Sequence, residues 1–333
     1  MDAMTPRASI LLLGVLIIEL AFVVSYIGAF HSPKPSRIPL AVVAPARAQA
    51  QVAVVGKLNE LPGTPLSARS ADSVGQARSM VLDRSVEAAL VIGPARGPDQ
   101  LLVASAGGPA GVQSLQLVFQ KVNGPGRAVV ITDLRPPNSA DGRGLSSFYL
   151  VVGLIVGGYL ASAALSMSFG VRPANPHRTA IRLGALAVLS VLSGLGGAII
   201  ADIVFGALTG HFWSLWWISV LVTFAAAAAG MAFQVLLGSA GVALSVLIFV
   251  VLGNPSAGGV FPASLLPPFW RDLGPALPNG AGVTLVRNYS YFGGHDTATA
   301  WWVLSAWAVG GVLVGVAASL LGKRRAERAA GTA

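Results

Sequence analysis

The stretch formed by residues 133–165 changes character halfway along its length. Up to Gly144 it is polar and rich in proline and glycine. From Leu145 onward it is apolar over about the 20 residues that a helix needs to cross a bilayer. We therefore expect a water-exposed domain to end here and a membrane bundle to begin.

The composition of the whole chain places it among integral membrane proteins. Hydrophobic residues make up 54% of its 333 residues and charged residues 11%, and the mean hydropathy is +0.71. The 22 basic residues outnumber the 13 acidic ones, but many lie at the ends of apolar segments, where the positive-inside rule explains them. Nucleic-acid binding is therefore not expected. The absence of cysteine excludes disulfides and thiolate chemistry.

The hydropathy pattern predicts six membrane spans. The first is too long for the apolar core of a signal peptide, so it is expected to be an uncleaved anchor. The fifth is short, so it either continues through Gly238 or is shielded by its neighbours. The predicted spans are residues 8–30, 146–169, 183–208, 215–236, 240–252 and 301–321.

Basic and aromatic residues both orient these spans. One basic group lies between spans two and three and another follows span six, which predicts that both termini are cytoplasmic. The aromatic residues lie at the opposite ends, as an interfacial belt requires. The basic groups are Arg172, His177, Arg178, Arg182 and Lys323, Arg324, Arg325, Arg328; the aromatic residues are Phe212, Trp213, Trp216, Trp217, Trp301 and Trp302.

The residues between the first two spans show the pattern of a small α/β domain. Short β-type runs alternate with segments of helical composition, and the length is sufficient for one core. The expected strands are residues 38–43, 86–92, 101–105 and 128–133, and the expected helices are residues 46–61, 73–83 and 109–122. Proline-rich segments, including residues 136–144, are expected to be spacers.

The predicted fold is thus an α-helical polytopic membrane protein, with six spans and an extracytoplasmic α/β domain inserted between spans one and two. Residues 1–31 form an N-terminal anchor helix, and residues 32–144 form the α/β domain. Residues 145–322 form a five-span bundle, in which residues 254–300 are an outer helical segment lying in the membrane interface or dipping into it. Residues 323–333 form a basic cytoplasmic tail.

The motifs of common enzyme classes are absent from the sequence. Gly56-Lys57 and Gly322-Lys323 are not followed by Ser or Thr, so the phosphate-binding loop pattern is missing. The four histidines are scattered without an H-E-x-x-H pair, and the surroundings of Ser239 do not match G-x-S-x-G. We therefore predict no catalytic residue, no metal site and no cofactor in this chain.

Two acids and several glycine pairs are the residues that stand out within the spans. Glu19 lies near the middle of span one, where it either lines a substrate or proton path or stabilises helix contacts. Asp202 lies nearer the outer end of span three and is more typical of an interface residue. Small-residue pairs four positions apart permit close helix packing, within one chain or at a dimer face. These pairs are Gly153 with Gly157, Gly206 with Gly210, and Gly311 with Gly315.

The order of these elements resembles a known transporter family. The stretches that carry the likeness are IPLAVV at residues 38–43, SVGQARSMVLDRSVEAALVI at residues 73–92, Asp133-Leu134-Arg135-Pro136 followed by Asp141 and Gly144, and Leu277-Pro278-Asn279-Gly280 with Arg287. Together they resemble the ABC type-2 membrane permease superfamily, in particular its phage-infection-protein-like branch with a large outer domain after the first span.

This resemblance implies a permease half that dimerises and works with a separate cytoplasmic ATPase, which would hold the ATP and Mg. The loop of residues 171–182 would contact that ATPase through Arg172, Asn175, His177 and Arg178, although these cations could also merely hold the loop inside. The expected pathway residues are Glu19, Asp202 and Arg287, and the expected dimer seam includes Gly153 and Gly157.

The function expected on this basis is export of an amphipathic or lipid-like molecule across a bacterial plasma membrane. The alternative is an ATPase-independent scaffold whose outer domain captures another component of the cell envelope. A third and more distant reading, an intramembrane enzyme, is disfavoured by the missing motifs.

Overall fold

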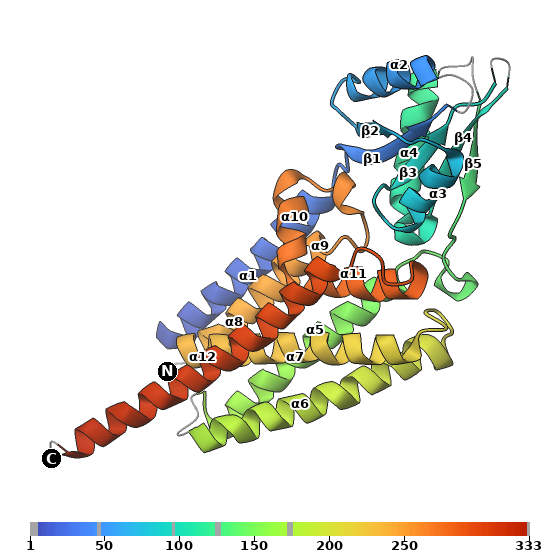
Figure 1. The fold of residues 1–333 in the computed structure, drawn as a ribbon. Helices are drawn as coiled ribbons and strands as arrows, with labels where there is room; N and C mark the ends of the chain where they lie inside the picture. The colour runs from blue at the N-terminus through green and yellow to red at the C-terminus, as the bar shows by residue number, and fades with distance from the viewer. Residues whose placement is uncertain (1–5, 45–47, 95–96, 124–127, 172–175, 332–333) are drawn as a thin grey trace.

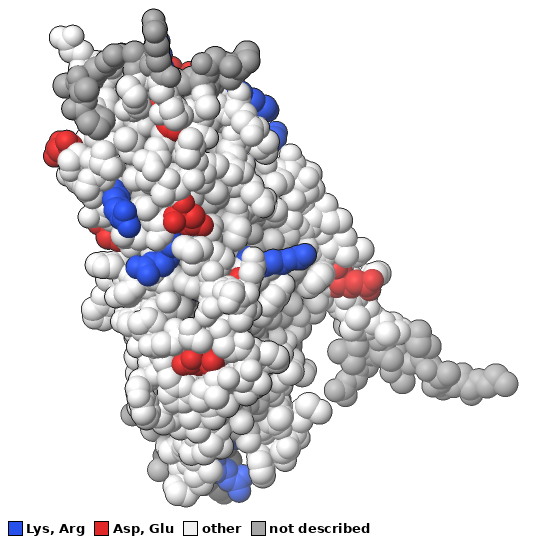
Figure 2. Space-filling model, turned by 90° about the vertical axis from the view of Figure 1, so that its right-hand side faces the viewer, with Lys and Arg blue, Asp and Glu red and all other residues white. Residues whose placement is uncertain are grey.

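The computed structural model describes residues 6–44, 48–94, 97–123, 128–171 and 176–331, and it consists of a helical bundle with an α/β domain at one end (Figure 1). Charged side chains on one face gather around the domain and its contact with the bundle, whereas the bundle surface below is almost uncharged (Figure 2). This division agrees with the change of character that the sequence shows within residues 133–165.

The α/β domain is built on a five-stranded sheet in the order β2-β1-β3-β4-β5. All neighbouring strands are parallel except β3 and β4, which are antiparallel. The strands are β1 (Ile38–Val43), β2 (Leu66–Ser70), β3 (Ala88–Val91), β4 (Asp99–Val103) and β5 (Val129–Asp133). The four predicted strands are confirmed. The sequence did not reveal β2, because its LSARS segment is mostly polar, as suits an edge strand.

Helices cover both faces of this sheet, as the alternation of strand and helix patterns predicts. Helices α2 (Ala48–Asn59) and α4 (Pro109–Asn123) pack on one face, and α3 (Val74–Leu82) packs on the other. The Oγ of Ser73 accepts a hydrogen bond of 3.1 Å from the backbone N–H of Gln76 and so caps the start of α3.

The bundle contains five helices that are long and apolar enough to cross a membrane, counted over the described residues. They are α1 (Pro6–Phe30), α5 (Ser146–Phe169), α6 (Pro176–Ala198) with its π-helical extension Ile199–Val204, α7 (Phe212–Leu237) and α12 (Ala298–Gly331). Helix α6, which corresponds to the predicted third span, begins at Pro176, seven residues before the predicted start at residue 183. Helix α12 continues through the predicted tail to Gly331.

The short predicted fifth span is a separate apolar helix of residues 240–256, interrupted by a π-helical turn. It comprises α8 (Ala240–Ser245), the π-helical Val246–Leu252 and α9 (Gly253–Ser256). At 1.5 Å per residue its length is about 25 Å, slightly less than the thickness of a bilayer core. It does not continue through Gly238, which has a φ of +69° and ends α7.

Helix α7 forms the centre of the bundle because small residues let its neighbours approach. Residues 225–230, five alanines and a glycine, are all buried. A Cβ atom at Gly158 of α5 would lie 2.5 Å from the carbonyl oxygen of Thr223, and one at Gly311 of α12 would lie 2.5 Å from the backbone of Ala228. Such contacts are the small-residue packing of membrane helices.

The segment between α9 and α12 packs more deeply than predicted. It contains α10 (Pro268–Leu273) and α11 (Pro278–Tyr291). Helix α11 packs against α5, α7 and α12, and most of its residues from Pro278 to Asn288 are buried. Helix α11 is therefore part of the bundle core. Of the two expected arrangements, it does not lie along the membrane interface.

This same segment completes the core of the α/β domain. Leu265 lies 1% exposed in the cluster beneath α2 and α4, and Phe292 lies 3% exposed in the cluster beneath α3. The domain boundary predicted at residues 32–144 thus leaves out two side chains that the sheet needs on its two faces. The contacts attach the domain firmly to the bundle.

We expect Leu265→Ala and Phe292→Ala to destabilise the α/β domain by about 2–5 kcal/mol each, because both remove large side chains from closed cores. Proteolysis of the full chain in increasing denaturant, scored at sites within the domain, measures the effect. Leu117→Ala is the matched control, because Leu117 is 60% exposed. Equal stability of all three variants would contradict the role assigned to the two contacts.

Candidate functional site

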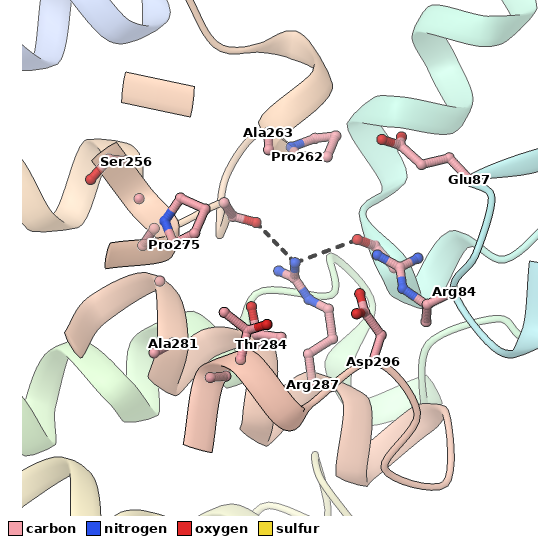
Figure 3. A pocket seen from close by; sticks show the side chains of 17 residues that line it. Arg84, Glu87, Ser256, Pro262, Ala263, Pro275, Ala281, Thr284, Arg287 and Asp296 are labelled. Atoms are coloured by element: carbon pink, nitrogen blue, oxygen red, sulfur yellow. Dashed lines mark hydrogen bonds between the residues drawn. The ribbon is translucent and has the colours of Figure 1, made fainter. Parts of the chain in front are cut away.

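A cavity of about 360 Å³ lies where the α/β domain meets the bundle. The domain contributes Arg84, Glu87 and Gly107 to its wall, and the bundle contributes α11, the start of α12 and the turns around α9 and α10. Two basic and two acidic side chains, Arg84, Arg287, Glu87 and Asp296, line it (Figure 3).

Arg287 projects from α11 into this region and is only 6% exposed. Its Nη1 donates hydrogen bonds to the carbonyl oxygens of Gly258 at 2.9 Å and Gly107 at 3.4 Å, and its Nη2 donates to the carbonyl oxygen of Gly259 at 3.2 Å. One guanidinium group therefore joins the domain and the bundle. Its Nε has no hydrogen-bond acceptor among the described residues.

Arg84 reaches the same place from the turn between α3 and β3. Its backbone is left-handed, with a φ of 67°, and its guanidinium carbon lies 4.8 Å from the ring centre of Phe292. A Cβ atom at Gly107 would clash with its Nη1, so the glycine leaves the space that the guanidinium occupies. Both arginines thus converge on Gly107.

The two carboxylates lie close to the arginines without forming ion pairs with them. Glu87 accepts a hydrogen bond of 3.0 Å from the Oγ of Ser264, and Asp296 lies in the exposed turn after α11 with a φ of 52°. The structure records no contact within 4 Å between these carboxylates and Arg84 or Arg287 over the residues it describes. Charges of both signs therefore face the cavity across gaps.

Burial shifts the pKa values of these groups. It lowers the pKa of Arg287 to about 10, and the neighbouring positive charge of Arg84 adds to the lowering. Burial also lowers the pKa of Arg84, and it raises the pKa of Glu87, which Ser264 and Arg84 partly counteract. Perturbed groups that share a cavity are typical of functional sites.

The residues that connect the domain to α5 form a structured joint instead of the predicted spacer. Asp141 is 4% exposed and accepts hydrogen bonds from the hydroxyl of Tyr291 at 2.7 Å and from the backbone N–H and Oγ of Ser146 at 2.9 and 2.6 Å. Asn138 donates from its Nδ2 to the carbonyl oxygen of Gly206 and to the Oγ1 of Thr209. The polar, proline-rich composition of this segment is typical of a spacer, so the sequence did not predict these tertiary contacts.

Tyr291 stabilises this joint as a hydrogen-bond donor. Burial raises its pKa, and the hydrogen bond to Asp141 raises it further. The hydroxyl therefore keeps its proton under conditions in which an exposed tyrosine ionises. The carboxylate of Asp141 also lies at the start of α5, where a negative charge is favourable.

The structure does not bring the three expected pathway residues together. Only Arg287 lines the cavity. Glu19 lies on the exposed surface of α1, and Asp202 is half-buried in the π-helical extension of α6.

The residues expected to contact an ATPase are described in part. Arg172 and Asn175 lie outside the described residues, while His177 and Arg178 are exposed in the first turn of α6. Gly153 and Gly157 lie on a face of α5 where an added Cβ would meet no atom within 4 Å. Within the chain it is Gly158, one residue further along, that permits the close approach to α7.

Sequence reasoning missed Arg84, Glu87 and Asp296. A sequence signal existed for the first two, since opposite charges three residues apart occupy the tight turn before an apolar strand. Nothing in the pattern connects them with Asp296, more than two hundred residues later. Among the described residues no cluster of His, Asp and Glu could hold a metal ion.

Tyr291→Phe should destabilise the joint by about 1.5–3 kcal/mol, because it removes a hydrogen bond to a buried carboxylate. The free energy of unfolding of the full chain in detergent measures this loss. Tyr149→Phe is the matched control, since Tyr149 is 62% exposed on α5. If both variants were equally stable, the hydrogen bond of Tyr291 would not hold the joint.

Comparisons with protein-family models, with curated proteins and with solved structures find no match to this chain.

Proposed function

We propose that this chain is the permease subunit of an ABC-type exporter, which moves an amphipathic or lipid-like molecule outward while a separate ATPase hydrolyses ATP. In this proposal the chain lies in a bacterial plasma membrane with six spans, both termini are cytoplasmic, and the α/β domain is extracytoplasmic. Two copies, or one copy and a related half, form the transport route.

The observation that carries this proposal is the charged cavity at the end of an otherwise apolar bundle. Burying charged groups is costly even when neutral groups hydrogen-bond to them, so a cluster of such groups beside a membrane region is a candidate substrate site. The cavity falls within the lower part of the size range of ligand pockets. Since it is walled by both the domain and α11, a movement of either part alters it.

The arrangement of the helix ends supports coupling to a cytoplasmic ATPase. The end of α5, the start of α6 and the end of α12 all lie at the end of the bundle away from the domain (Figure 1). ATP hydrolysis there would favour one of two bundle arrangements, and each arrangement would shape the cavity differently. His177 and Arg178 are the described, exposed residues at the proposed contact.

The scaffold function remains the second candidate because the α/β domain is fixed to the bundle through both of its faces. A fixed domain suits the capture of an envelope component. Unlike the permease, a scaffold needs no energy source, so the ATPase separates the two functions.

The decisive experiment combines this chain with the ATPase encoded nearest to its gene, in proteoliposomes. We expect the two to copurify and the chain to stimulate ATP hydrolysis, and we expect His177→Glu with Arg178→Glu to reduce the stimulation about tenfold through charge reversal at an exposed contact. Lys57→Glu on α2 is the matched control and should have no effect. Absence of both copurification and stimulation would overturn the permease function and favour the scaffold.

A second prediction concerns the dimer. Gly153→Leu and Gly157→Leu should shift the chain from dimer to monomer without unfolding it, because the space around both positions is empty within one copy. Size-exclusion chromatography with light scattering measures the change. Gly158→Leu should instead unfold the chain, since its side chain would collide with α7. If the first two variants remained dimers, the dimer seam would lie elsewhere.

In the proposed dimer, Glu19 faces the transport route between the two copies.

A further inference from the structure

The hydrogen bonds of Arg287 leave part of the donor capacity of its guanidinium group unused. The group has five N–H bonds, and the carbonyl oxygens of Gly107, Gly258 and Gly259 accept from three of them. The two that remain are the Nε–H and one Nη2–H. The Nε–H is buried without an acceptor among the described residues, and the free Nη2–H is a donor that an oxyanion in the cavity could accept from through a charge-assisted hydrogen bond.

Arg84 offers a second set of donors at the same place. Its side chain contacts the face of Phe292 and donates no hydrogen bond to the described residues. Because Gly107 lies between the two guanidinium groups, their donors approach one region from two elements in different directions. Two guanidinium groups that approach from different directions suit a tetrahedral phosphate better than a planar carboxylate.

The acidic side chains provide the opposite recognition. Glu87 has one hydrogen-bond donor, Ser264, and the carboxylate of Asp296 has none among the described residues. Both face the cavity beside Arg84 (Figure 3). A purely anionic ligand would be repelled by them, whereas a ligand that also carries an ammonium group would hydrogen-bond to them.

We infer that this cavity binds a zwitterion composed of a phosphate and a primary ammonium group, as in phosphoethanolamine. Arg84 and Arg287 bind the phosphate, and Glu87 and Asp296 bind the ammonium group. The cavity volume, about 360 Å³, suits a headgroup and not a whole lipid. As an assignment of the transported substrate this inference rests on the proposed permease function; as an assignment of a ligand it rests on the cavity alone.

Calorimetry on the full chain in phospholipid-free maltoside micelles tests the binding. Glycerophosphoethanolamine should bind at least about tenfold more tightly than glycerol 3-phosphate, which lacks the ammonium group, and than glycerophosphocholine, whose quaternary nitrogen has no N–H. Equal affinity for glycerol 3-phosphate would overturn the zwitterion, and no binding of any probe would show that the cavity holds only water.

Variants separate the two halves of the site. Gly107→Ala displaces the flexible end of Arg84. This variant and Arg84→Gln should each weaken the binding of glycerophosphoethanolamine and of glycerol 3-phosphate about tenfold. Glu87→Gln and Asp296→Asn should weaken glycerophosphoethanolamine alone and so remove its preference over glycerol 3-phosphate.

The matched control is Arg271→Gln with Asp272→Asn, which removes a partly exposed ion pair whose residues do not line the cavity. It should leave both affinities unchanged. An equal loss in the control, or wild-type binding in all four cavity variants, would overturn the assignment. Thermal unfolding of each variant shows whether it is folded.

Nanodiscs distinguish the two sources of this chemistry. If the headgroup of a bilayer lipid fills the cavity, phosphatidylethanolamine discs should weaken the binding of the soluble probe by competition, while phosphatidylglycerol discs should not. If the soluble probe binds with unweakened affinity in both kinds of disc, the ligand is a soluble phosphoethanolamine compound. If both lipids weaken the binding of the probe equally, the ammonium group is not required. Binding without stimulated ATP hydrolysis would reject the permease function and keep the ligand, and the reverse result would reject only the ligand.

Discussion

The close approach of helices to α7 is the constraint on which the rest of the structure depends. Apolar helices gain little from hydrophobic association where their surroundings are equally apolar, so packing must come from close contact. The alanines of α7, together with Gly158 and Gly311 on its neighbours, permit that contact. Because α5, α7 and α12 are fixed in this way, they form the surface on which α11 is buried. A larger side chain at any of these positions would therefore also displace α11.

The burial of α11 fixes the position of Arg287, which links both parts of the protein through its contacts with carbonyl oxygens. Arg287 donates to Gly107 of the domain and to Gly258 and Gly259 of the bundle. Leu265 and Phe292, which lie within the same stretch of chain as the cavity-lining residues of the bundle, complete the two cores of the domain. The domain is therefore held by apolar contacts on its faces and by the hydrogen bonds of a buried arginine where it meets the bundle. The apolar contacts set the position of the domain on the bundle, and the guanidinium group of Arg287 supplies a charge to the cavity.

The sequence predicted the elements well and their contacts poorly, for physical reasons. Strand β1 and helix α5 were predicted with their observed bounds because hydrophobic pattern and length are local properties. The cavity depends on Arg84, Arg287 and Asp296 meeting through the fold, and nothing local records such a meeting. Gly153 and Gly158 show the same limit. Five positions along a helix place them on different faces, and only the structure shows which of them contacts α7.

Helix α11 gives the proposed transport cycle a mechanical connection. Arg287 and Tyr291 are four residues apart and lie on neighbouring turns of its surface, so a movement of α11 at the cavity also moves the donor to Asp141. Asp141 binds the start of α5, and at the other end of that helix Arg182 of α6 donates to the carbonyl oxygen of Phe169 at 2.8 Å. His177 and Arg178 lie one to two turns before Arg182. In the proposed exporter, ligand in the cavity and an ATPase at the far end would therefore act on the same helix, α5, from its two ends. Coupling through α5 requires that the joint at Asp141 be rigid, and its three hydrogen bonds from Tyr291 and Ser146 provide that rigidity.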